Sequence, residues 1–143
     1  MLDYDKILNK NMLNVFKEIL RSIKDNGLEG NNHLYITFLT NNKNVKLPKW
    51  IKQKFPEEMT IVIQYEYYNL EINKDNFSIT LSFNDIKAKL KISYESIVSF
   101  ADPSANFGLI LQKNKIQKKF RKNLESKKSI KNNVIDFSSY KKD

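Results

Sequence analysis

The sequence predicts a mainly β protein: a small barrel or strongly bent sheet, preceded by an N-terminal amphipathic α-helix and followed by a disordered C-terminal tail. Three observations lead to this fold class. Apolar and polar residues alternate in short runs between turn signals, as in residues 77–83 and 88–92. An apolar stripe at helical spacing occupies residues 3–24. From about Gln112 onward Lys, Asn and Ser dominate, which is typical of disorder.

The helix predicted over residues 3–24 has apolar side chains at the i, i+3, i+4 and i+7 positions. Asp3 or Asp5 can cap its first turn, and Gly27 can adopt the left-handed conformation that ends a helix. A stripe of this length needs a covering surface, either a sheet of the same chain or a partner subunit, and the pattern leaves both open. The stripe consists of Leu8, Met12, Val15, Phe16, Ile19, Leu20 and Ile23.

Five or six short strands are expected after the helix, joined by turns. Residues 45–55, with Pro48 and Trp50, are predicted to be irregular with one helical turn, and residues 93–99 to form a helical turn before a strand. The other strands are expected at residues 33–39, 59–63, 77–83, 88–92 and 107–111.

Residues 56–72 are the first indication of a binding surface. An apolar run typical of a buried strand is followed there by Tyr65, Tyr67 and Tyr68, with Glu66 among them. Neighbouring strand residues face opposite ways, so the three tyrosines cannot all point inward. Tyrosine provides a rigid, amphipathic contact surface at low entropic cost. Any single one of them could equally cap the core.

The expected hairpin over residues 77–92 carries a row of small polar side chains, Ser78, Thr80 and Ser82, on its outer face. Small side chains leave space for an approaching backbone, whereas a purely solvated face more often carries charges. We interpret this row as part of the same candidate surface.

The positive charge of the chain belongs to its C-terminal part. The net charge is +9, and residues 113–143 hold eleven of the 25 Lys and Arg but only three of the 16 acidic residues. Residues 1–112 therefore carry only +1, which argues against nucleic-acid binding by the folded part.

Several chemistries are not expected. The chain has no cysteine, and His33, its single histidine, has no carboxylate at ligand spacing, so a metal role is disfavoured. Adjacent Glu57 and Glu58 are interpreted as a solvated pair rather than an acid–base pair. No nucleotide-binding glycine pattern and no catalytic triad spacing occur, so neither an enzyme nor a cofactor is expected. No apolar run approaches membrane-spanning length, and a cytoplasmic protein is expected.

The tail divides into two parts. Residues 113–133 read as a flexible basic linker, and the composition becomes partly apolar again in residues 134–143. Apolar anchors at the end of a flexible arm commonly form a short motif that orders on a partner.

Several segments, extending in one register over about residues 4–111, carry a more specific signal. They are HLYITF at 33–38, PEEMTIVIQ at 56–64, LSF at 81–83 and FADPSANFGL at 100–109, with VIDFSSYKK near the C-terminus. Together they resemble the SspB family of adaptors, in particular its alphaproteobacterial branch. The chain differs from that pattern in its long Lys/Asn-rich linker and in Tyr67-Tyr68.

The resemblance implies an open SH3/Sm-like barrel in residues 1–112, a homodimer, and a proteolytic adaptor rather than an enzyme. In this family a groove captures ssrA-type degradation tags, and the tail docks on the unfoldase ClpX of the ClpXP protease. The peptide-binding residues expected here are Phe38, Gln64, Tyr65, Glu66, Tyr68, Thr80, Ser82 and Phe107. The ClpX-docking residues expected here are Val134, Ile135, Phe137, Tyr140, Lys141 and Lys142.

The alternative function is a small Sm-like RNA-binding module with a basic tail, because small barrels often bind nucleic acid. The discriminating feature is the net positive charge of the barrel, which is only +1 for residues 1–112.

Overall fold

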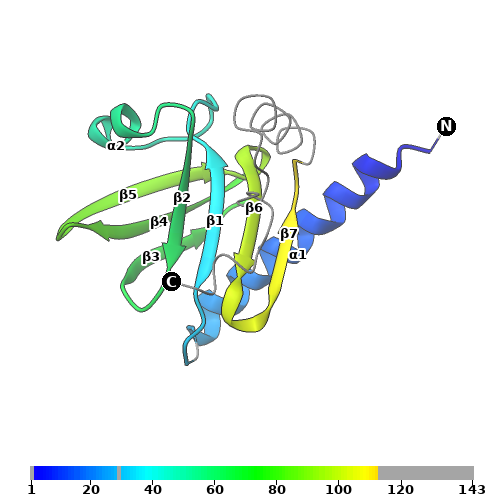
Figure 1. The fold of residues 1–143 in the computed structure, drawn as a ribbon, viewed down its shortest axis with the longest axis horizontal. Helices are drawn as coiled ribbons and strands as arrows, with labels where there is room; N and C mark the ends of the chain where they lie inside the picture. The colour runs from blue at the N-terminus through cyan, green and yellow to red at the C-terminus, as the bar shows by residue number, and fades with distance from the viewer. Residues whose placement is uncertain (1, 29, 113–143) are drawn as a thin grey trace, which may run out of the picture.

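A computed structural model describes residues 2–28 and 30–112, so the expected linker and docking motif lie outside the described residues. This part of the chain forms one long helix and two antiparallel sheets (Figure 1). The four-stranded sheet has the order β2-β1-β6-β7, with β1 (Leu34–Leu39), β2 (Glu58–Ile63), β6 (Ile97–Asp102) and β7 (Phe107–Ile110). The three-stranded sheet has the order β3-β4-β5, with β3 (Tyr67–Ile72), β4 (Asn76–Phe83) and β5 (Ile86–Ser93).

The predicted fold class is confirmed: the protein is mainly β, with an N-terminal helix and sheets that do not close. The expected number of strands was too low, since the described residues contain seven. The additional strand is β3, because residues 56–72 bend after β2 and start a second strand at Tyr67. The helical turn expected within residues 45–55 is α2 (Lys49–Lys54), and the turn expected before the strand in residues 93–99 is the 3-10 turn η1 (Tyr94–Ser96). A second 3-10 turn, η2 (Pro103–Ala105), precedes β7.

Helix α1 (Tyr4–Asn26) begins and ends as the sequence predicts. The Asp3 carboxylate accepts a hydrogen bond of 3.1 Å from the Lys6 backbone N–H. Gly27 ends the helix at φ 74°, and its N–H donates to the Ile23 carbonyl at 2.8 Å. Positive φ is the conformation that glycine adopts without a steric penalty.

Most of the predicted apolar stripe is buried. Met12, Phe16, Leu20 and Ile23 lie in the core, with Ile19 packed against it. Leu8 is 46% exposed and Val15 39% exposed, so the expectation of one continuous buried stripe was wrong for these two. The first turns of α1 extend beyond the sheets (Figure 1), which leaves Leu8 uncovered, whereas Val15 lies at the margin of the buried face.

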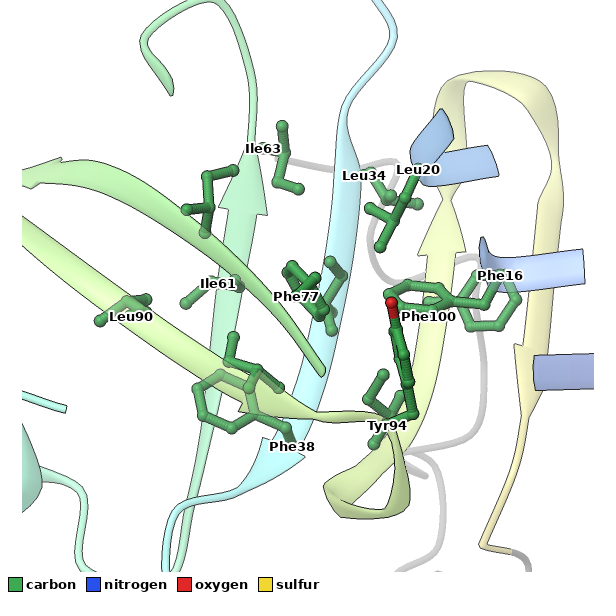
Figure 2. Close-up of a cluster of buried hydrophobic side chains, with 14 of the residues drawn as sticks. Phe16, Leu20, Leu34, Phe38, Ile61, Ile63, Phe77, Leu90, Tyr94 and Phe100 are labelled. Carbon is green, nitrogen blue, oxygen red and sulfur yellow. The ribbon is translucent and has the colours of Figure 1, made fainter. Parts of the chain in front are cut away.

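Phe16 joins the helix to both sheets. Its ring lies 5.6 Å from that of Phe77 on β4 and 4.9 Å from that of Phe100 on β6. Tyr94 completes the cluster at 6.4 Å, edge-on to Phe16 (Figure 2). Such tilted and edge-on pairs are the favoured geometries for aromatic rings. Phe16, which is fully buried, therefore connects the helix to both sheets within their shared core.

No helix in the described ranges is long and apolar enough to cross a bilayer.

We predict that Phe16→Ala lowers the free energy of unfolding by about 3–5 kcal/mol, the usual cost of an aromatic-sized cavity in a core. Urea denaturation of both proteins measures the difference. Val15→Ala, at the preceding and exposed residue, is the control and should cost below about 1 kcal/mol. Equal costs for the two variants would contradict the placement of Phe16.

Candidate peptide-binding groove

A hollow of about 470 Å³ opens between the two sheets, next to the connection from β2 to β3. Three consecutive residues of β2 form one side, and three at the end of β4 form the other. We call this hollow the groove. It is lined by Thr60, Ile61, Val62, Gln64, Tyr65, Glu66, Leu81, Ser82 and Phe83.

Both strands that border the groove present unpaired backbone edges. Strand β2 is the outermost strand of its sheet, so one of its two edges pairs with β1 and the other is open among the described residues. Strand β3 pairs with β4 only as far as Leu81. Ser82 and Phe83 consequently pair with β5 alone. Open edges offer backbone N–H and C=O groups to an added strand.

The connection between β2 and β3 supplies the polar rim of the groove. Gln64, Tyr65 and Glu66 are all exposed, and Tyr65 is 75% exposed. The ring of His33 lies edge-on to that of Tyr65, with centroids 6.2 Å apart. His33 also contacts the Asn31 carbonyl through Nδ1. The single histidine thus packs beside the rim.

The three tyrosines divide between the faces, as the sequence predicts. Tyr67 packs against the core and its hydroxyl donates to the Ile23 carbonyl at 3.4 Å. Tyr68 lies on the outer face of the three-stranded sheet, directly opposite Thr80 on β4. The Lys87 ammonium sits 4.3 Å from the centre of the Tyr68 ring, within the range of a cation–π contact.

The structure brings together only some of the expected peptide-binding residues. Gln64, Tyr65, Glu66 and Ser82 line the groove. Tyr68 and Thr80 do not line it but lie on the adjoining outer face of the sheet.

Two other expected residues lie elsewhere. Phe38 is fully buried among the core side chains (Figure 2), because on β1 the residues 34, 36 and 38 face inward, so it cannot shape an accessible pocket directly. Phe107, at the start of β7, lines a separate hollow beside the end of α1, together with residues such as Gly27 and Leu28. Neither aromatic therefore lines the groove: burial contradicts a direct peptide contact for Phe38, and such a contact for Phe107 stays a prediction.

Sequence reasoning missed five lining residues, Thr60, Ile61, Val62, Leu81 and Phe83. Thr60 was the residue that could have indicated this side of the groove. It is polar, it interrupts the apolar run of β2, and it therefore marks an exposed face of that strand. Its hydroxyl lies 2.8 Å from that of Thr37 on β1. The position of β2 at a sheet edge depends on strand order, which local sequence patterns do not contain.

The chemistry of the groove is that of a binding surface. Glu66 is its single charged lining residue among those described, and the other lining side chains are apolar or neutral. The described residues contain no group of three His, Cys, Asp or Glu side chains able to hold a metal ion. Two open edges flanked by small and apolar side chains suit an extended polypeptide that pairs through its backbone.

The fold and the groove thus define an open antiparallel β protein with a groove between two strand edges. The model of the family described as SspB, stringent starvation protein B, matches residues 7–142 of the chain. The chain belongs to the SspB family, which is a family of adaptors for the ClpXP protease and not of enzymes. A comparison with curated proteins found no match.

We predict an alternating pattern of amide hydrogen exchange along the two groove edges. Successive amides of a strand point to opposite sides, so of Ser82 and Phe83 one amide faces β5 and the other the groove. The groove-facing amide should exchange quickly and its neighbour slowly, and the same should hold for Ile61 and Val62 on β2. NMR-detected exchange measures this, with the central strand β1 as the control in which both neighbours are protected. Uniform protection of both pairs would show that the edges are already covered.

Proposed function

We propose that this protein is a ClpXP adaptor that binds ssrA-type degradation tags in the groove and delivers the tagged protein through its C-terminal tail. The open edges of β2 and of Ser82 and Phe83 on β4 carry this proposal. A tag that inserts as an extra strand gains main-chain hydrogen bonds from them, and the lining side chains give specificity. Small residues at Ser82 and Thr60 leave room for the backbone of the tag.

The charge distribution fits this division of labour. The near-neutral domain binds the tag, while the basic segment at residues 113–133 is predicted to be a linker that carries the ClpX-docking motif of residues 134–143. A disordered spacer of about 20 residues has an r.m.s. reach of roughly 25 Å. Tethering of this kind raises the local substrate concentration to roughly the millimolar range, with avidity gains of about 10²–10⁴.

We further propose that the adaptor works as a homodimer in the cytoplasm. The beginning of α1 carries Tyr4, Ile7 and Leu8, which are 73%, 50% and 46% exposed, on turns that extend beyond the sheets. An exposed apolar patch of this kind commonly marks a protein interface. Two tails on one dimer would strengthen the tether to ClpX.

Ser82→Arg is expected to weaken binding of a fluorescent ssrA-type peptide by roughly tenfold or more, because the long charged side chain occupies the groove. Fluorescence anisotropy measures the affinity, and the thermal midpoint should stay the same since Ser82 is not fully buried. Ser22→Arg, on the exposed side of α1, is the matched control. Thr80→Arg should have a smaller effect because Thr80 adjoins the groove without lining it. Unchanged affinity in Ser82→Arg would exclude the groove as the tag site.

Deletion of residues 134–143 is expected to abolish the stimulation of ClpXP while leaving the affinity for the tag peptide unchanged. The readout is the degradation rate of an ssrA-tagged fluorescent protein, with the peptide titration run in parallel. Loss of tag binding in the truncated chain would refute the proposed separation of the two roles.

A further inference from the structure

One end of the groove continues into an exposed apolar surface. Trp50 on α2 is 42% exposed and Ile86 at the start of β5 is 56% exposed. Phe83 lies between them: its ring is 6.1 Å from that of Trp50 in an edge-on contact, and it pairs directly across the hairpin with Ile86. We call these three residues the Trp50 shelf.

The shelf is continuous with the groove and rigid. Phe83 belongs to both, because it also lines the groove. Ile51, which is only 1% exposed, anchors α2 to the core. Asn84 and Asp85 form the hairpin turn with φ values of 51° and 68°, as a two-residue turn of the tightest kind requires. Trp50 and Ile86 thus lie on elements that are packed into the fold.

The groove is too short to hold a whole tag. Each bordering strand contributes three consecutive residues, which span about 10 Å at 3.4 Å per residue. Only about three or four residues of an extended peptide fit that length. A tag that must also reach an unfoldase is longer, so it extends past an end of the groove, and at the Phe83 end it meets Trp50.

Charge is specific only at the end of the groove next to Glu66. Helix α2 carries three lysines, but Glu57 and Glu58 follow it at the start of β2, and Asp85 lies in the turn beside Ile86. The charges at the shelf end are therefore mixed and select no charge on a peptide. Glu66 follows β2 at the other end, where it favours a neutral or basic residue of a bound peptide.

We propose that the Trp50 shelf is a second subsite for the tag, which takes one apolar side chain just outside the groove. This inference rests on the proposed tag-binding function. The partner is an extended peptide, because the shelf continues a groove whose open edges suit a single strand.

Trp50 is the only tryptophan of the chain, so its fluorescence reports directly on the shelf. A tryptophan-free ssrA-type peptide, added to the full chain, should shift the emission to the blue. It should also lower the acrylamide quenching constant by about twofold, since a bound side chain covers a face of the ring. Replacing each apolar residue of the peptide by Ala should identify one position that still binds but no longer causes the shift. That peptide variant should bind about tenfold more weakly.

A double-mutant cycle completes the test. In Trp50→Ala, or in Ile86→Ala if the first variant folds poorly, the parent and Ala-substituted peptides should bind with equal affinity. Val15→Ala, an exposed apolar residue that lines neither the groove nor the shelf, is the control and should retain the tenfold difference. Binding without any change in Trp50 emission overturns the subsite alone, whereas no binding by the wild-type chain overturns the proposed function as well.

The same fluorescence signal tests for two other occupants of the shelf. A blue shift on raising the protein concentration without peptide would assign the shelf to a second copy. A red shift on deleting residues 134–143 would assign it to the tail of the same chain. Either result overturns the proposal.

Discussion

The insertion of Phe16 between the two sheets is the contact on which the rest of the architecture depends. Its ring touches Phe77 from one sheet and Phe100 from the other, with Tyr94 beside them. The two sheets share no strand, so the distance between them is set by packed side chains rather than by a continuous hydrogen-bonded ladder. The groove exists because the sheets are held together here and remain apart between β2 and the end of β4.

Local sequence patterns were sufficient to locate most helices and strands but not all residues of the groove. Alternation located β1, β4 and β5 to within a few residues, and helical spacing with Asp3 and Gly27 located α1. Alternation gives the two faces of a strand without saying which of them is covered. For that reason Phe38 was expected to contact a peptide, although it lies on the buried face of β1. The separation of Phe107 from Ser82 depends on strand order, which arises from contacts between distant segments.

The groove and the exposed part of α1 offer different kinds of interaction to a partner. Backbone edges bind any chain that can extend, with side-chain preferences added by the few lining residues. The apolar residues at the start of α1 offer area without directional groups, as subunit contacts commonly do. Because these features lie on different elements, each can vary in sequence without disturbing the other.

The open edge of β2 carries a hazard as well as a use. Exposed strand edges promote pairing between copies of a protein and, in the extreme, amyloid growth. Here the edge is recessed between two sheets and beneath the connection bearing Tyr65. A lone polypeptide segment can enter such a recess, but the border of a folded sheet, with its neighbouring strands, is too wide. In the proposed function, this recess would admit unstructured chain ends and exclude folded neighbours.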